Sequence, residues 1–333
     1  MPQPLLSVRN LKKWFPVRTG FFATLFAKER EYVHAVDGIS FDIMRKEIFC
    51  LAGESGCGKT TTGKLVLRLI EPTDGTIIFD GKNVLEMDKN ELKRFRRRAQ
   101  MIFQDPYESL DSRMTVYETI AEPLEVHKLA SSREEKLEKV IKALELVKLV
   151  PPEEFLFRYP HELSGGQRQR VAIAASMVME PEFVVADEPV SMLDASVRGG
   201  ILTDIMEIRR RTGITLMYIT HDLSIAYVIA DRIAVMYLGR IVEMGDVKQV
   251  FKNPLHPYTK ALLSVVPLPQ PKAKLQRKRI ILRGEPPNPI KIPQGCRFHP
   301  RCYIAKEICR RIDPELVEVE RGHYVACHFS GEG

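Results

Sequence analysis

The sequence predicts an α/β fold in which apolar parallel strands alternate with helices that cover both faces of a sheet. The first observation is a set of short, almost wholly apolar runs at 48–52, 183–186 and 215–219, which are typical of strands buried on both faces. The second is that stretches with helical spacing of apolar residues follow these runs. The third is a helix-rich stretch from about 113 to 180, which predicts a helical subdomain inserted between strands.

The other elements are expected in a definite order along the chain. Residues 6–11 alternate well enough for an edge strand, and residues 16–31, with Pro16 and Gly20, indicate an inserted loop. Beyond about residue 267 the chain is rich in Pro, Lys and Arg, which indicates a linker and a small appendage. Further strands are expected at 32–43, 76–79, 99–103 and 232–237, and helices at 60–70, 136–149, 166–179 and 197–211.

Length and composition fit one large domain plus an appendage: the chain has 333 residues, of which 44% are hydrophobic and 28% charged. No run approaches 18 apolar residues and the N-terminus has no signal-like core, so we expect a cytosolic chain without a membrane span. The net charge is +7, with basic runs at 93–98 and 272–279. We expect these runs to be solvated surface, with contact to lipid headgroups as the alternative.

The segment 53–60 fits the phosphate-loop pattern, with a strand before it and a helix after it. Its glycines let backbone N–H groups converge on the β- and γ-phosphates of a nucleotide. Lys59 would add a point charge there, and the Thr60 hydroxyl would be a Mg²⁺ ligand. The residues expected to bind nucleotide in this segment are Gly53, Glu54, Ser55, Gly56, Cys57, Gly58, Lys59, Thr60 and Thr61.

Two carboxylates, Asp187 and Glu188, follow the apolar run at 183–186. Ligands of open α/β sheets bind at the C-terminal ends of the strands, where these side chains would emerge. We expect Asp187 to hold Mg²⁺, largely through water, and Glu188 to polarise the attacking water.

A second anion site is expected where the helix 166–179 begins. Ser164, Gly165, Gly166 and Gln167 start this helix, so its first N–H groups and the Ser164 hydroxyl favour an anion. The phosphate loop already surrounds this chain's own nucleotide. The second site must therefore serve the nucleotide of a partner, which predicts dimerisation driven by ATP and released by hydrolysis.

Together, and in this order, these motifs resemble the ATP-binding subunit of an ATP-binding cassette (ABC) transporter. The resemblance implies a phosphate-loop ATPase core with an N-terminal antiparallel β subdomain. It also implies an ATP-binding domain at 1–266, with a helical subdomain at about 105–180, and a Cys-rich C-terminal region at 267–333.

The resemblance assigns roles to further residues. Gln104 resembles the glutamine that senses Mg²⁺, and His221 resembles the switch histidine that contacts the γ-phosphate. Asp194 resembles the aspartate that joins the two sites of a dimer, although Met192 departs from the usual small residue. The adenine ring would stack on Phe15, with Trp14 and Tyr32 as alternatives, for about 1 kcal/mol beyond burial.

The segments 100–110, 113–115, 159–164, 253–262, 284–289 and 295–302 are similar to the oligopeptide/dipeptide importer subfamily. The long loop after Phe15 favours the second, F-type, of its two ATPase subunits. The implied partners are a second, different ATPase, two membrane-spanning permease subunits and an external solute-binding protein. The chain would then be peripheral on the cytoplasmic face of the cell membrane.

The solute implied by the subfamily is a dipeptide or oligopeptide, with short oligosaccharides and nickel chelates as alternatives. A soluble ABC ATPase acting on nucleic acid or ribosomes is a distant alternative, because this chain has one cassette and no long heptad insertion. We expect no nucleic-acid partner. A subunit without ATPase activity is disfavoured, because Lys59, Glu188 and His221 are all present.

Four of the six cysteines crowd the C-terminal region, with five, six and seventeen residues between them. Such clustering in a cytosolic protein indicates a metal or cluster site, but the spacing is not that of a zinc ribbon. The resemblance implies a [4Fe–4S] cluster as a structural staple, with Zn²⁺ or unligated thiols as alternatives. The expected ligands are Cys296, Cys302, Cys309 and Cys327, with His299, His323 and His328 as alternative ligands or ordinary surface histidines.

Overall fold

The computed structural model describes residues 3–17, 31–266, 279–282 and 284–331. Most of the expected inserted loop at 16–31 and of the basic run at 272–279 lies outside the described residues. The chain divides into two compact units. The first contains Met1–Ile43, Ile48–Leu85 and Ile219–Gly333, and the second contains Met44–Glu47 and Glu86–Tyr218. None of the helices described is long and apolar enough to cross a membrane.

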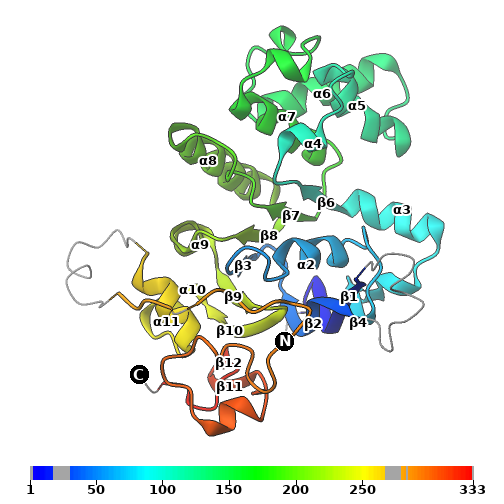
Figure 1. The fold of residues 1–333 in the computed structure, drawn as a ribbon. Coiled ribbons are helices and arrows are strands. Elements are labelled where there is room, and N and C mark those ends of the chain that lie inside the picture. The colour runs from blue at the N-terminus through cyan, green and yellow to red at the C-terminus, as the bar shows by residue number, and fades with distance from the viewer. Residues whose placement is uncertain (1–2, 18–30, 267–278, 283, 332–333) are drawn as a thin grey trace, which may run out of the picture. The chain divides into compact units, whose positions relative to one another are not determined.

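The first unit contains the antiparallel β subdomain (Figure 1). Strand β1 (Leu6–Pro16) pairs with β2 (Tyr32–Ile43) on one side and with β4 (Asp74–Phe79) on the other, and β5 (Lys82–Asn83) extends the sheet beyond β4. The expectation of an edge strand at 6–11 was therefore wrong. Alternation of buried and exposed side chains shows which face is covered, but not whether one or both edges find a partner.

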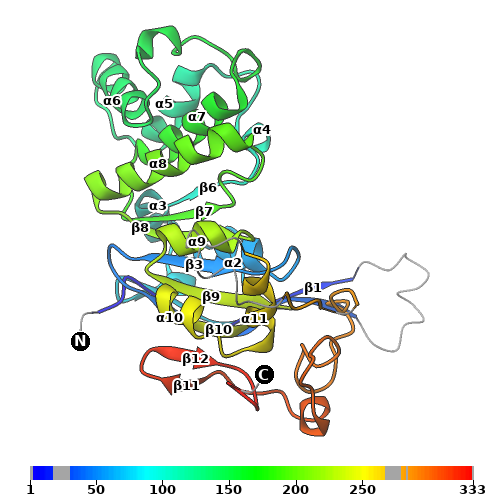
Figure 2. The same ribbon diagram turned by 90° about the vertical axis from the view of Figure 1, so that its left-hand side faces the viewer.

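The same unit contains a second set of strands in the order β11-β12-β10-β9-β3. The short strand β3 runs parallel to β9, whereas β9, β10, β12 and β11 pair in antiparallel fashion. Figure 2 shows β11 and β12, from the Cys-rich region, beside β10. The bounds are β3 (Ile48–Ala52), β9 (Arg232–Tyr237), β10 (Arg240–Asp246), β11 (Val317–Glu320) and β12 (His323–Val325).

The described residues of the first unit form four helices beside these strands. The helix α2, which follows the glycine-rich segment, ends at Val66 rather than at the expected residue 70, and Arg68 beyond it has a left-handed φ of 47°. Helix α10 packs against β9 and β10. The bounds are α2 (Lys59–Val66), α9 (Leu223–Ile229), α10 (Val247–Lys252) and α11 (Pro257–Ser264).

The second unit combines three strands in the order β8-β7-β6 with six helices. The parallel neighbours β6 and β7 confirm the parallel α/β core. Helices α5, α6 and α7 pack on one another and form the helical part of this unit (Figure 1). The bounds are β6 (Ala99–Ile102), β7 (Phe183–Asp187), β8 (Thr215–Thr220), α3 (Lys89–Arg98), α4 (Pro106–Ser109), α5 (Val116–Val126), α6 (Arg133–Leu146), α7 (Gly165–Met177) and α8 (Ala195–Thr212).

Polar caps set where these helices begin. The Ser132 hydroxyl accepts a hydrogen bond from the Glu135 amide, so α6 begins three residues before the expected start at 136. Thr115 and Ser164 cap α5 and α7 in the same way. On α6, Val140 and Leu144 are fully buried, as the helical spacing of apolar residues predicts, whereas Leu137 of the same spacing is 38% exposed.

Candidate functional site

The phosphate loop connects β3 to α2 and lies against the backbone of two neighbouring strands. A Cβ atom on Gly53 would stand 2.2 Å from the Met236 carbonyl oxygen of β9, and one on Gly58 would stand 2.1 Å from the Ala35 carbonyl oxygen of β2. Both glycines also have left-handed φ values, 155° and 107°. The loop can therefore approach these strands only with glycine at both positions.

The Lys59 side chain lies inside the loop, with 5% of its surface exposed. Its Nζ donates hydrogen bonds to the carbonyl oxygens of Gly53 (2.8 Å) and Glu54 (2.9 Å). These bonds fix the ammonium among the loop amides that would face a phosphate. Burial raises the pKa of the Cys57 thiol, against the opposing effect of the nearby Lys59 charge, so Cys57 is a packed neutral thiol.

The other expected residues of the loop differ in exposure. Ser55 and Gly56 are exposed, whereas Thr60 and Thr61 at the start of α2 are half-buried. The Glu54 carboxylate is held by Arg301 of the Cys-rich region, and the Glu54 backbone N–H donates to the Tyr258 hydroxyl (3.0 Å). Sequence reasoning missed Arg301 and Tyr258, because nothing local in the sequence links either residue to the loop.

In the second unit, Gln104 and Glu188 come together. The Gln104 Nε2 donates to the Glu188 Oε2 (3.3 Å), and the Ser191 hydroxyl donates to the Glu188 carbonyl oxygen (3.0 Å). Asp187, at the end of β7, is 2% exposed. Glu188 itself has a left-handed φ of 43°, so the backbone turns sharply at the residue expected to polarise water.

The expected second anion site lies at the start of α7. The Ser164 hydroxyl accepts from the Gln167 amide (3.3 Å), and the Gln167 side chain accepts from the Ser164 amide (2.9 Å), which forms a capping box. A Cβ atom on Gly166 would stand 2.6 Å from Val197 Cγ1 of α8. The start of α7 is therefore packed closely against the start of α8.

The loop that contains Asp194 leads directly into α8. Asp194 is exposed at the N-cap of α8, and Met192 is 63% exposed. Arg198 of the same helix donates to the carbonyl oxygens of Leu193 (2.8 Å) and Ser191 (3.2 Å). These bonds hold the loop in place, although a large residue stands at position 192.

The remaining expected residues belong to the first unit. His221 is exposed at the end of β8. Phe15 is 38% exposed, with the Lys13 ammonium 4.9 Å from its ring centre. Trp14 donates its indole N–H to Asp37 (2.9 Å) and packs on the His34 ring at 4.4 Å, so it is tied into the unit.

The four C-terminal cysteines are free thiols that line one narrow cavity, together with His299 and His328. Burial raises the pKa of the Cys296 thiol to about 12, and the nearby Cys309 and Cys327 thiols act in the same direction. Within the described ranges, however, no group of three or more His, Cys, Asp or Glu side chains could hold a metal ion as it stands.

His323 differs from the expectation of a surface residue or an alternative ligand. It is fully buried, and its Nε2 lies 2.8 Å from the Glu243 carboxylate. Glu243 also accepts from the backbone amides of Leu255 (2.8 Å) and His256 (3.0 Å). The surface interpretation of His323 was wrong, because this histidine joins β12 to β10 through a buried polar network.

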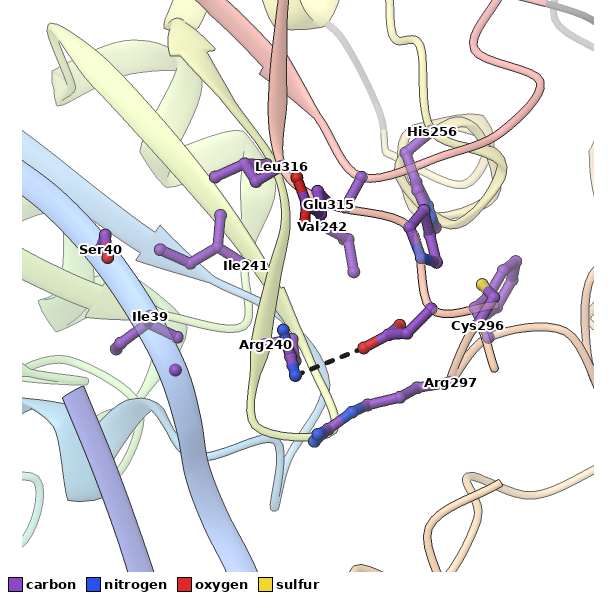
Figure 3. A pocket seen from close by; sticks show the side chains of 15 residues that line it. Ile39, Ser40, Arg240, Ile241, Val242, His256, Cys296, Arg297, Glu315 and Leu316 are labelled. Atoms are coloured by element: carbon purple, nitrogen blue, oxygen red, sulfur yellow. Dashed lines mark ion pairs between the residues drawn. The ribbon is translucent and has the colours of Figure 1, made fainter. Parts of the chain in front are cut away.

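A second cavity of about 240 Å³ adjoins the cysteine cavity and was not expected from the sequence. Its lining comes from β2, β10, His256 and the Cys-rich region, and two of the lining residues, Arg240 and Asp313, form an ion pair of 3.3 Å. Figure 3 shows Arg297 extending from the segment of Cys296 past this cavity.

Comparison with known proteins agrees with this geometry. The family model "ABC transporter" matches residues 36–191, and the model "Oligopeptide/dipeptide transporter, C-terminal region" matches residues 242–309. The oligopeptide transport ATP-binding protein AppF of Bacillus subtilis is 43% identical over 328 residues, which make up 98% of this chain and 98% of that protein.

Two solved structures are similar to this chain. A dimeric, post-hydrolysis structure of the ATP-binding cassette MJ0796 bound to ADP and Pi is 27% identical, with a TM-score of 0.62, and the match covers 73% of this chain and 98% of that one. CbiO1 from Clostridium perfringens, part of the ABC transporter complex CbiONQ, is 29% identical, with a TM-score of 0.62. That match covers 75% of this chain and 91% of CbiO1.

The fold and the phosphate loop thus define an ABC-type ATPase. The chain belongs to the ATP-binding proteins of ABC transporters, in the oligopeptide/dipeptide group. It is the ATP-hydrolysing subunit of an importer.

Proposed function

We propose that this subunit binds Mg-ATP at the phosphate loop and that its hydrolysis drives peptide uptake. The observation that carries the proposal is the Lys59 ammonium, buried inside an intact glycine-rich loop that packs directly on β9 and β2. A buried cation surrounded by backbone amides and followed by a helix N-terminus is suited to a polyphosphate.

Each catalytic role is part of the same proposal. Glu188 polarises the attacking water, with Gln104 hydrogen-bonded to its carboxylate. His221 contacts the γ-phosphate, and Thr60, Gln104 and Asp187 hold Mg²⁺. The adenine ring stacks on Phe15, which is more exposed than Trp14 or Tyr32. The nucleotide-binding set is completed by Gly53, Glu54, Ser55, Gly56, Cys57, Gly58, Thr61, Ser164, Gly165, Gly166, Gln167 and Asp194.

The working state is a heterodimer with a second, similar ATPase, in which this chain is the F-type subunit. A capping box orders the N-terminal end of α7, which supports an anion site there. The related cassette MJ0796 was solved as a dimer. A Glu188→Gln chain that forms no ATP-dependent dimer with its partner ATPase would rule this arrangement out.

The proposal divides the chain into two domains. Residues 1–266 are the ATP-binding domain, which includes the helical subdomain at about 105–180, and residues 267–333 are the C-terminal region. The subunit acts at the cytoplasmic face of the membrane, where ATP is available, as a peripheral partner of two permease subunits. A solute-binding protein delivers the solute from outside.

The solute is a dipeptide or oligopeptide, a choice supported by the name of the relative AppF. The test is uptake into liposomes that contain the whole complex and ATP, with labelled peptides, short oligosaccharides and a nickel chelate offered in parallel. Uptake of peptide that depends on ATP supports the proposal. Uptake of oligosaccharide or nickel chelate alone would replace the peptide assignment and leave the ATPase assignment intact.

A separate proposal concerns the cysteine cavity: Cys296, Cys302, Cys309 and Cys327 hold a [4Fe–4S] cluster. Four free thiols on one cavity are a ligand set suited to such a cluster. As these side chains stand they do not form a metal site, so the thiolates must reorient around the cluster. Anaerobically purified protein should be brown and contain iron and sulfide. Colourless protein with stoichiometric zinc would instead establish the alternative.

A further inference from the structure

The Cys-rich region contacts the phosphate loop through one ion pair. Arg301 Nη1 lies 2.9 Å from Glu54 Oε2, and Arg301 Nη2 lies 3.3 Å from Glu54 Oε1. The Arg301 side chain is 8% exposed and that of Glu54 is 28% exposed. A two-point contact between planar, partly buried groups is stronger and better oriented than an ordinary surface ion pair.

Aromatic rings fix both partners of this ion pair. The Arg301 guanidinium lies 5.9 Å from the centre of the Tyr237 ring. The Tyr258 hydroxyl accepts from the Glu54 amide at 3.0 Å. Phe298 packs on both tyrosines, at 5.2 Å from Tyr237 and 5.4 Å from Tyr258. One packed cluster therefore joins the phosphate loop, the last residue of β9, helix α11 and the cysteine segment, which runs from Cys296 to Cys302.

A second arginine holds the cysteine segment against the same unit. Arg297 pairs with the Asp37 carboxylate and donates to the Leu238 carbonyl oxygen (2.6 Å), and it is largely buried. The Trp14 indole N–H donates to the same Asp37. Arg297 follows Cys296 directly, and Arg301 precedes Cys302 directly. The position of Arg301 is therefore set by the fold of the cysteine segment rather than by a flexible tail.

We propose that Arg301 is a positioning residue of the nucleotide site. It neutralises the Glu54 carboxylate and holds it away from the phosphates, so that the phosphate loop keeps its binding geometry. Without the arginine, a carboxylate of the loop itself would be unpaired beside an anionic ligand, which electrostatics disfavours. The inference rests on the proposed function, because it requires nucleotide at this loop.

The test compares the affinity of full-length variants for Mg-ADP, measured by titration calorimetry. Arg301→Gln should weaken binding by about 5- to 30-fold, because the loop then carries an unneutralised carboxylate; this factor corresponds to about 1–2 kcal/mol. The matched control is Arg311→Gln, because Arg311 lies in the same region but pairs with Glu307 at the surface, where its side chain is 73% exposed. This control should bind like the unaltered chain.

A second change separates positioning from a general loss of structure. Glu54→Gln removes the charge that Arg301 neutralises, so Arg301→Gln combined with Glu54→Gln should recover most of the lost affinity. A variant that was merely misfolded would not be rescued by a second substitution. Arg301→Lys keeps one charge without the two-point contact and should lie between the unaltered chain and Arg301→Gln.

The outcomes are distinct. Unchanged affinity of Arg301→Gln, or a loss that Glu54→Gln does not relieve, overturns the inference and leaves nucleotide binding in place. If the unaltered chain does not bind Mg-ADP, or if Lys59→Ala binds it equally well, the proposed nucleotide site fails and the inference fails with it.

Discussion

The Gln104 side-chain amide donates a hydrogen bond of 3.3 Å to the Glu188 carboxylate, although 84 residues separate them in the chain. The contact forms because β6 and β7 are parallel neighbours, so the segments that leave their C-terminal ends meet. Both residues were candidates on sequence grounds, but for different reasons. Their contact is a property of the folded unit.

Replacing Glu188 by Gln should leave nucleotide binding intact and reduce hydrolysis by about 100-fold or more, the range expected for loss of a general base. The substitution preserves size and the hydrogen bond from Gln104, but removes the carboxylate that polarises water. Phosphate release and the Kd for Mg-ATP are the measurements. Glu138→Gln is the control, because Glu138 lies exposed on α6 and pairs only with Lys142 among the ion pairs described. Equal hydrolysis by the Glu188 and Glu138 variants would contradict the assigned role.

Replacing Gln104 by Ala should reduce the rate of hydrolysis by about 10-fold, less than the loss at Glu188, because a side-chain hydrogen bond contributes roughly 1 kcal/mol. The Ala side chain can neither orient the Glu188 carboxylate nor reach the Ser191 hydroxyl, which lies 3.5 Å from Gln104 Nε2. Combining this change with Glu188→Gln should add little further loss, because the two residues act as a pair. Full additivity of the two effects would show that they act independently.

Replacing Lys59 by Ala should abolish measurable Mg-ATP binding and hydrolysis. The buried ammonium is the positive charge inside the loop, and its bonds to Gly53 and Glu54 also hold the loop in shape. Lys64→Ala on the same helix is the control and should bind normally, since Lys64 lies in the last turn of α2. Binding by the Lys59 variant with an affinity near that of the control would move the nucleotide away from this loop.

The stability of the first unit should fall as the pH is lowered from about 6.5 to about 4. Burial lowers the pKa of His256 to about 4, and its Nδ1 accepts a hydrogen bond from the Tyr258 amide at 3.1 Å. In this window the unfolded chain takes up a proton that the folded chain does not, so the folded state loses on the order of 3 kcal/mol.

The measurement is the unfolding free energy in urea across this pH range, compared with His256→Asn. Asparagine can accept the same helix-capping hydrogen bond but does not titrate. The neighbouring Glu243 and His323 are present in both chains. The difference between the two chains in how steeply the unfolding free energy changes with pH therefore reports on His256. Parallel slopes for the two chains would assign the acid sensitivity to other groups.

Much of the fold was predictable because its signals are local. The apolar runs at 48–52 and 183–186 became β3 and β7, and the helix at 197–211 became α8 with one or two more residues at each end. The strands β10, β11 and β12 were not predicted. Strands β11 and β12 have only four and three residues, and β12 pairs with the distant strand β10 rather than showing a strong pattern of its own.

The candidate site divides in the same way. The glycines and Lys59 of the phosphate loop were predictable, because the required residue types occur within eight positions of the chain. The partners of Glu54 were not predictable, because Tyr258 and Arg301 lie 204 and 247 residues away. His323 was misjudged for the same reason, since its burial depends on Glu243 of another strand.

The sequence by itself determined the class of protein, the phosphate loop and the cysteine set, since each depends on residue types at short spacing. Tertiary structure alone decided that Gln104 meets Glu188, that four thiols share one cavity, and that Arg301 holds the loop residue Glu54. Long-range pairing of charges and rings depends on how strands and helices pack, and the residues adjacent in sequence do not indicate that packing.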